Sequence, residues 1–204
     1  MDNFDVIPFS GKPIAKLKSN YKFSNQETTS LNEMTFNHQN GGTQITKNNQ
    51  VLNTHVLSNF KNYLLSVANN YATDILGVNN KIELTHSWLT KNTKGNSHNR
   101  HCHPNIFFSM VYYLHCKSGQ LVFDTEKSIL QQTFNFDYQI KDYNIFNSSS
   151  WSINVMTNDM VLFPGDMIHS TTPNEHDEDR IVLGLNFFAK GVFGLDDNYG
   201  KLEL

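Results

Sequence analysis

The chain has 204 residues, of which 38% are hydrophobic and 17% charged, and this composition is typical of one soluble globular domain with a sizeable core. Its net charge of -3 argues against nucleic-acid binding, which depends on clustered Lys and Arg facing phosphates. No stretch approaches the roughly 18 apolar residues of a membrane span, and no basic stretch followed by an apolar run stands at the start. We therefore expect a cytoplasmic protein that binds neither nucleic acid nor membranes, with Cys102 and Cys116 as free thiols.

Residues 1–50 are rich in Asn, Thr, Ser and Gln, and we expect an edge strand around residues 7–9 followed by loops, with a turn at the Gly41-Gly42 pair. In the next segment, residues 51–78, apolar side chains recur at steps of three and four, which is one face of an amphipathic helix. Gly77 is a plausible C-cap. We expect this helix to cover a sheet.

From residue 81 onward the pattern changes to short apolar or alternating runs separated by turn-forming residues, which is typical of β-strands. The predicted strands span residues 82–89, 105–116, 119–124, 160–165 and 180–189. Residues 128–151 show no clear pattern and are expected to form a hairpin or a loop. Without repeats or linkers, the sequence predicts a single domain, 1–204, whose mainly β core at 80–190 is a jelly roll or sandwich.

The stretch His101-Cys102-His103 carries the clearest chemical signal. Residues two apart on a strand face the same way, so His101 and His103 would project together while Cys102 points to the opposite face. A third ligand is offered by His169, which follows a turn at Pro164-Gly165. Three neutral imidazoles suit Fe(II), Zn(II), Cu or Ni, so the ligand type alone does not name the metal.

Arg180 opens a predicted strand that is otherwise apolar, and an arginine in such a place needs an anion. Its planar fork suits a carboxylate, so a dicarboxylic acid bound to the metal at one end could be held by Arg180 at the other. The alternative is an ion pair with one of the acidic residues just before it, Asp177, Glu178 or Asp179.

These residues occur in an order that resembles the 2-oxoglutarate- and Fe(II)-dependent oxygenases related to prolyl hydroxylases. The resemblance covers about residues 80–190, and it includes the Ser87-Trp88-Leu89 run that leads into the site. Its motifs are His101-x-His103-Pro104, Ser109-x-Val111-Tyr112-Tyr113-Leu114, Gly119-x-Leu121-x-Phe123, Leu162-Phe163-Pro164 leading to His169, Pro173-Asn174, and Arg180-Ile181 to Asn186-Phe187.

The resemblance implies a double-stranded β-helix with at least one supporting N-terminal helix, and a site for Fe(II), 2-oxoglutarate and O2. It implies that 2-oxoglutarate is decarboxylated to succinate while a C–H bond of a peptidyl or small-molecule substrate is hydroxylated. His101, His103 and His169 would bind the iron, and Arg180 would hold the distal carboxylate of 2-oxoglutarate. The expected helpers, in phase with these residues on unbroken strands, are Ser109, Tyr113 and Asn186.

Two positions depart from the wider pattern of such enzymes. Position 103 is histidine where a carboxylate is usual, so either His103 completes a three-histidine centre, which we favour, or another group or water takes that place. Val182 stands where the wider pattern has a serine beside the arginine, which weakens the 2-oxoglutarate assignment modestly.

Two other functions remain open at this point. The run PGDMIHSTTPN also resembles the second motif of cupins, which would make the chain a metal-binding isomerase, dioxygenase or ligand sensor without 2-oxoglutarate. The first motif of cupins, however, has a Glu a few residues after the two histidines, and this Glu is missing after His103. The presence of Arg180 at the start of an apolar strand would also have no explanation. A β-sandwich binding module with incidental histidines is the non-enzymatic alternative. Substrate identity and oligomeric state, including a homodimer, stay open.

The remaining histidines and both tryptophans are expected to have structural or surface roles. The histidines lie in loops, on the helix, or out of phase with the proposed ligand face: His38, His55, His86, His98, His115 and His176. Trp88 and Trp151 are expected to pack in the core or at its rim.

Overall fold

The computed structural model describes residues 11–38, 42–136, 138–194 and 199–204, so the predicted strand at residues 7–9 lies outside the described residues. Within these described ranges, sixteen elements follow one another in chain order. They are β1 (Ala15–Lys18), α1 (Asn25–Asn32), β2 (Phe36–His38), β3 (Gln44–Thr46), α2 (Ser58–Asn70), the π-helical turn η1 (Tyr71–Ile75), β4 (Lys81–Asn92), β5 (Phe108–His115), β6 (Gly119–Asp124), α3 (Ile129–Phe134), β7 (Ser150–Val155), β8 (Asp159–Pro164), β9 (Ile168–Thr171), β10 (Arg180–Lys190), β11 (Val192–Phe193) and β12 (Leu202–Glu203).

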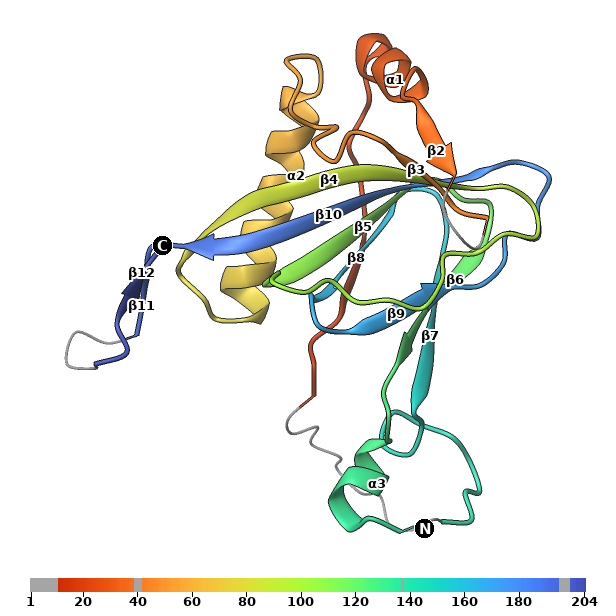
Figure 1. Ribbon diagram of the computed structural model, residues 1–204, viewed down its shortest axis with the longest axis vertical. Helices are drawn as coiled ribbons and strands as arrows, with labels where there is room; N and C mark the ends of the chain where they lie inside the picture. Colours follow the sequence, from red (N-terminus) through yellow and green to blue (C-terminus); the bar gives the residue numbers. More distant parts are fainter. Residues whose placement is uncertain (1–10, 39–41, 137, 195–198) are drawn as a thin grey trace.

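Two antiparallel sheets form the body of the protein (Figure 1). The larger has seven strands in the order β1-β8-β5-β10-β4-β3-β2, and the smaller has three in the order β7-β6-β9. β11 and β12 form a separate two-stranded pair near the C-terminus. The chain passes between the two sheets from β5 to β6, from β7 to β8, from β8 to β9 and from β9 to β10, so the predicted double-stranded β-helix is confirmed.

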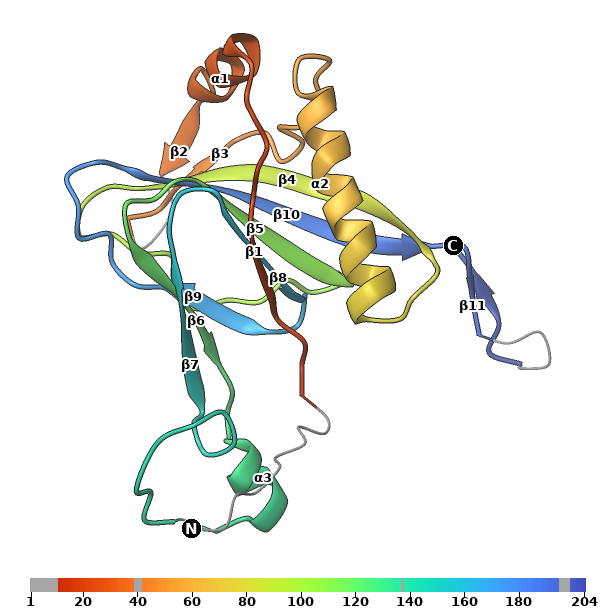
Figure 2. The same cartoon turned by 180° about the vertical axis from the view of Figure 1, so that it is seen from behind.

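Helix α2 covers the outer face of the seven-stranded sheet, as Figure 2 shows from behind. Phe60 and Leu64 of this helix are buried in one cluster with Tyr112 of β5 and Leu183 of β10. Burial of apolar side chains stabilises the pair of layers by roughly 1.5–3 kcal/mol for each fully buried side chain. The expectation that a helix covers the sheet is therefore correct.

Alternate residues of the same strands face the opposite way, into the space between the two sheets. Tyr113 and Val182 are sequence neighbours of Tyr112 and Leu183, which belong to the cluster under α2, here called the outer cluster. They face the other way and pack with Phe123 of β6 and Phe163 of β8. Phe163 of this inner cluster lies edge-on to His169 with ring centroids 4.7 Å apart. The inner cluster therefore borders the site described below.

Helix α2 begins later than the predicted segment 51–78. Val51 and Leu52 are buried and donate their backbone N–H groups to the backbone oxygen and the side-chain hydroxyl of Ser87 in β4. These bonds hold residues 51 and 52 against β4, so the two residues are not part of the helix. At the other end Gly77 has φ +66, and the N–H of Val78 bonds the carbonyl of Ala72, so the predicted C-cap is correct.

Residues 128–151, whose sequence shows no clear pattern, contain a short helix, α3, and an irregular loop. Both project beyond the three-stranded sheet (Figure 1). The sequence alternatives were a hairpin or a loop, and the helix was not expected. Among the described residues, no helix combines the length and the apolar character needed to cross a bilayer.

Candidate metal centre

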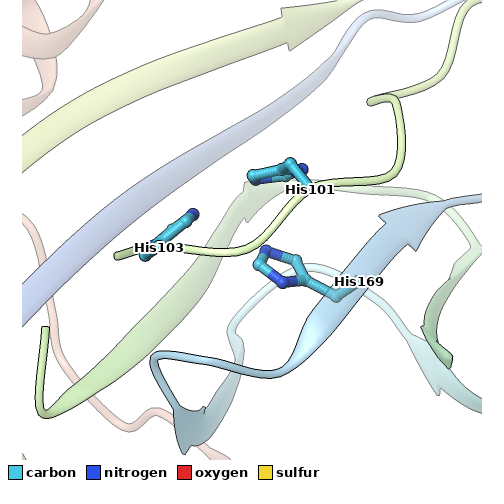
Figure 3. A group of neighbouring side chains, drawn as sticks. All are labelled: His101, His103 and His169. Carbon is cyan, nitrogen blue, oxygen red and sulfur yellow. The ribbon is translucent and has the colours of Figure 1, made fainter. Parts of the chain in front are cut away.

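The side chains of three histidines, His101, His103 and His169, lie close together (Figure 3). His101 and His103 lie in the connection between β4 and β5, and His169 lies in β9. Each offers one ring nitrogen to a common space, and these three atoms lie within 4.8 Å of one another. Within the described part of the chain they form the one group of three or more His, Cys, Asp or Glu residues with this spacing.

Backbone hydrogen bonds hold the two ligand segments together. His101 and His169 pair as an isolated antiparallel bridge, with N–H to carbonyl distances of 2.9 and 2.8 Å. The N–H of His103 donates to the carbonyl of Gly165 at 2.9 Å. A Cβ at position 165 would lie 2.7 Å from the carbonyl oxygen of Ile106, so glycine permits this close passage.

The predicted strand at 105–116 begins only at Phe108, so His101 and His103 do not share an unbroken strand with Ser109. Asn105 has φ +61, a left-handed conformation that Asn tolerates better than most residues, and it turns the chain before β5 starts. The two histidines converge nevertheless, because Gly165 and His169 anchor their segment from the opposite side.

The δ nitrogens of all three rings are engaged by oxygen atoms. Nδ1 of His101 lies 2.7 Å from the carbonyl of Asn99, and Nδ1 of His169 lies 2.9 Å from the carbonyl of Met167. Nδ1 of His103 lies 2.6 Å from Oδ1 of Asn186. Because carbonyl and amide oxygens only accept, each Nδ1 carries the proton, which leaves Nε2 as the unprotonated nitrogen available to a metal ion.

Burial favours the neutral form of these imidazoles. It lowers the pKa of His169 to about 3, and neighbouring His101 acts in the same direction. Burial also lowers the pKa of His101 and of His103, although the carbonyl of Asn99 and the side chain of Asn186 act in the opposite direction. Neutral imidazole is the form that binds metal ions, so the site is electrostatically prepared for one.

Ser109 and Asn186, which the sequence analysis assigned to cosubstrate binding, contact His103. The hydroxyl of Ser109 lies 2.8 Å from Nδ1 of His103 and donates to Oδ1 of Asn186, also at 2.8 Å. Both residues are buried or nearly so. Their position fixes the orientation and the tautomer of His103, and it does not bring them to Arg180.

Arg180 is 1% exposed, yet its guanidinium is only partly hydrogen-bonded. Nη2 donates to the hydroxyl of Thr171 at 2.9 Å and to the carbonyl of Thr172 at 2.8 Å. Nε and Nη1 of Arg180 and the hydroxyl of Tyr113 are the buried side-chain polar atoms without a partner in the described residues. Burying hydrogen-bond donors of this kind destabilises the folded protein unless an acceptor binds to them.

The alternative ion pair between Arg180 and the preceding acidic residues does not form. Those carboxylates face lysines on the surface: Asp177 lies 2.8 Å from Lys94, Glu178 lies 4.0 Å from Lys117, and Asp179 lies 4.0 Å from Lys91.

Burial raises the pKa of Tyr113 well above its usual range, and the positive charge of Arg180 acts in the opposite direction. Tyr113 is therefore a neutral hydroxyl that can donate, beside an arginine with two unpartnered nitrogens, Nε and Nη1. An anion with a planar, oxygen-rich group, such as a carboxylate, would satisfy all three atoms.

An inner cavity connects the histidines with the neighbourhood of Arg180. It runs from His101, His103 and His169 to Asn92 and Thr171. Asn92 pairs with Arg180 across β4 and β10, and Thr171 is its hydrogen-bond acceptor. A small dicarboxylate could therefore reach from the metal centre towards the guanidinium.

Several residues at the site were not predicted from the sequence or were expected to have only a structural role. Thr171 lies two residues after His169, hence on the same face of β9, and this spacing could have revealed it. His98 stacks on His101 with ring centroids 4.3 Å apart, but it is outside the group of three convergent nitrogens. Trp88, expected to be packing, lines the inner cavity and lies edge-on to His103 at 5.5 Å. Cys102 and the other histidines, for which no ligand role was expected, are outside the convergent group within the described chain.

The match to a known protein family covers the residues of this site. The model of the family described as "Putative 2OG-Fe(II) oxygenase" matches residues 86–186, which include the three histidines and Arg180. No curated protein matches the chain.

Among solved structures the chain is similar to an oxidoreductase of the 2OG-Fe(II) oxygenase family from Burkholderia pseudomallei, at 12% identity and a TM-score of 0.59, with 85% of this chain and 83% of that chain covered. It is also similar to HygX from Streptomyces hygroscopicus with nickel and 2-oxoglutarate bound, at 10% identity and a TM-score of 0.60, with 87% and 83% covered. A third structure, the α-ketoglutarate-dependent epimerase SnoN from nogalamycin biosynthesis, has 9% identity and a TM-score of 0.59, with 92% and 83% covered. At these identities the likeness shows the fold alone.

Proposed function

The chain belongs to the family of 2-oxoglutarate- and Fe(II)-dependent oxygenases, and from this premise we propose that it hydroxylates a C–H bond of a small-molecule or peptidyl substrate. In the balanced reaction, 2-oxoglutarate, O2 and the substrate give succinate, CO2 and the hydroxylated substrate. One oxygen atom of O2 enters succinate and the other enters the product.

The observation that carries the proposal is the set of three buried polar atoms without partners, Nε and Nη1 of Arg180 and the hydroxyl of Tyr113. They belong to the residues that would receive the distal carboxylate of 2-oxoglutarate. A cupin-like metal site without this cosubstrate would leave a buried guanidinium half unsatisfied, so we favour the oxygenase.

The residues present fit the implied metal. His101, His103 and His169 would hold Fe(II) through Nε2, since each Nδ1 already has an oxygen partner. When bound, the iron with 2-oxoglutarate supplies the activation of O2. The protein itself orients the ligands: Asn186 and Ser109 hold His103, and the carbonyl of Met167 holds His169.

Three neutral ligands leave more positive charge on the metal than a set that contains a carboxylate. Among the described residues, no Asp or Glu joins the convergent group. We therefore propose a three-histidine centre in which His103 is a ligand, and the charge of the two 2-oxoglutarate carboxylates would be balanced by the metal and Arg180.

Anaerobic addition of Fe(II) and 2-oxoglutarate tests the proposal. A chelated complex has a weak visible charge-transfer band, and we expect it with the wild-type protein. Arg180→Met should lose the band because the distal carboxylate loses its partner, and His169→Ala should lose it because the metal is not held.

Two surface variants serve as controls. Arg100, the other arginine of the chain, is exposed and lies 3.5 Å from Asp124, so Arg100→Met should keep the band. His55 is exposed, and His55→Ala should also keep it. Absence of the band in wild-type protein that binds Fe(II) would contradict the use of 2-oxoglutarate and favour the cupin-like alternative. Release of succinate under air is the second readout.

A further inference from the structure

A second cavity, of about 390 Å³, opens beside the metal centre on the side away from Arg180. It shares His101, His103 and Trp88 with the inner cavity, so a molecule bound there would lie next to the metal. Its size is within the range of small-molecule sites. Within the oxygenase proposed above, this cavity is where the substrate would bind.

The lining of this outer cavity contains no charged residue among those that the structure describes. Ile45, Pro104, Ile106 and Trp88 give it apolar walls, and its polar groups include His86 and Asn49. Apart from the metal ion beside it, the lining offers no opposite charge to a charged group, which would lose hydration here. The nearby cation Arg100 is paired with Asp124 and does not line the cavity.

Trp88 provides a preformed aromatic wall. A Cβ on Gly184, the residue paired with Trp88 on β10, would lie 2.5 Å from the indole. The ring is therefore packed against bare backbone on one side, and the ring of His103 lies 5.5 Å away. An indole held in this way favours stacking or edge contacts with a ring-shaped ligand.

The wall of the outer cavity also contains hydrogen-bonding groups. His86 lies opposite Asn186 at an irregularity in the pairing of β4 and β10. Its Nδ1 lies 3.1 Å from the hydroxyl of Thr85, and Nε2 has no partner among the described residues. The wall can thus meet hydroxyl or carbonyl groups of a ligand.

We infer that the substrate is an uncharged, ring-containing small molecule with hydroxyl or carbonyl groups, bound in this outer cavity against Trp88. Free amino acids, whose ammonium and carboxylate groups need opposite charges, do not fit this lining. This inference deepens the proposed function, and it can be tested without turnover.

The chain itself contains the reporter. Trp88 and Trp151 are its two tryptophans, and Trp151 is 45% exposed on β7. The variant Trp151→Phe therefore leaves Trp88 as the single source of indole fluorescence. Three quenchers of nearly equal shape, 4-nitrobenzyl alcohol, 4-nitrobenzoate and 4-nitrobenzylamine, differ chiefly in charge.

We expect saturable quenching by the neutral alcohol, with a Kd at least roughly tenfold below that of either charged compound. The titration is run without metal and again with Ni(II) and 2-oxoglutarate, and the same ranking is expected in both. Charged probes that bind as tightly as the alcohol, or quenching by the alcohol that does not saturate, would overturn the inference.

A matched pair of variants locates the binding. Ile106→Asp places a carboxylate in the wall and should shift the preference to the amine by roughly tenfold or more, whereas Ile106→Asn should keep the original ranking. Thermal unfolding of both variants checks that they fold. If Ile106→Asp changes nothing, the probe binds elsewhere and the inference is wrong. Because quenching needs no cosubstrate, loss of the charge-transfer band would contradict the proposed function alone.

Discussion

The indole of Trp88 and the backbone of Gly184 touch across β4 and β10, so closely that a Cβ at position 184 would lie 2.5 Å from the ring. Gly184→Ala must therefore displace the indole towards the cavities that it lines. We expect a loss of roughly 1–3 kcal/mol in the free energy of unfolding, as is usual for an overpacked interior, and weaker binding of 4-nitrobenzyl alcohol.

The double variant Trp88→Phe with Gly184→Ala provides the control. A smaller ring leaves room for the new methyl group, so the second change should recover part of the stability lost in Gly184→Ala. Urea unfolding of the four proteins measures this coupling. Strict additivity of the two single changes would show that the contact has no energetic role.

Tyr113→Phe removes a buried hydroxyl that has no partner among the described residues. Since no hydrogen bond is lost, we expect the metal-free variant to be at least as stable as wild type, with a gain of up to about 1 kcal/mol. Binding of 2-oxoglutarate to the Ni(II)-loaded protein should weaken by roughly tenfold, as for a lost hydrogen bond to a charged group. Calorimetric titration measures the affinity.

Tyr112→Phe is the matched comparison for this change. Tyr112 lies next in sequence but faces the outer cluster under α2, and its hydroxyl bonds Asn158 at 3.3 Å. This variant should bind 2-oxoglutarate as wild type does. Equal weakening in both variants would indicate a general effect on β5 instead of a contact with the cosubstrate.

Asn186→Ala removes the acceptor that holds Nδ1 of His103 at 2.6 Å. Partners of metal-binding imidazoles typically contribute a factor of about 10–100 in metal affinity, and we expect a loss of this size. Competition with a chromophoric chelator, using Zn(II) or Ni(II), measures it. Asn154→Ala, at an exposed asparagine on β7, should leave the metal affinity unchanged.

The stability of the metal-free protein should fall in acid because the pKa of folded His169 is lowered by burial to about 3. Between its ordinary pKa of 6.5 and about 3, the unfolded chain holds a proton on this residue that the folded chain does not. Unfolding is then favoured as the pH falls through this window, by about 1.4 kcal/mol per pH unit for this one group, and is unaffected above it.

Denaturant unfolding of wild type and His169→Gln between about pH 7.5 and about pH 4.5 measures this contribution. The glutamine variant does not titrate here, so its stability should depend less steeply on pH. Identical pH slopes for the two proteins would mean that His169 is protonated in the folded state.

The approximate positions of β4, β6, β8 and β10 could be predicted from the sequence because alternation is a local property, whereas β1, β2, β3 and β7 were not among the predicted strands. β6 begins and ends where its apolar run does, and β10 extends one residue beyond the predicted span. Helix α1 was missed, although Ser24 and Glu27 form a capping box that is visible in the sequence as Ser-x-x-Glu. The same signal, Ser128 with Gln131, begins the unexpected helix α3.

The composition of the site could be predicted only in part. His101, His103 and His169 were found by spacing, although the expected unbroken strand is absent. The contacts of Ser109 and Asn186 with His103 depend on how β5 and β10 pair across many intervening residues, which no local pattern reveals. The uncharged lining of the outer cavity is likewise a property of the assembled sheet.

The paired backbones of His101 and His169 have a consequence for solubility. β9 is the last strand of the three-stranded sheet, and an open strand edge can recruit another chain. Here the ligand segment lies along that edge and occupies part of it with the two hydrogen bonds of the bridge. A metal ion shared by these two residues would keep the edge covered, so the same contact would serve both metal binding and protection from aggregation.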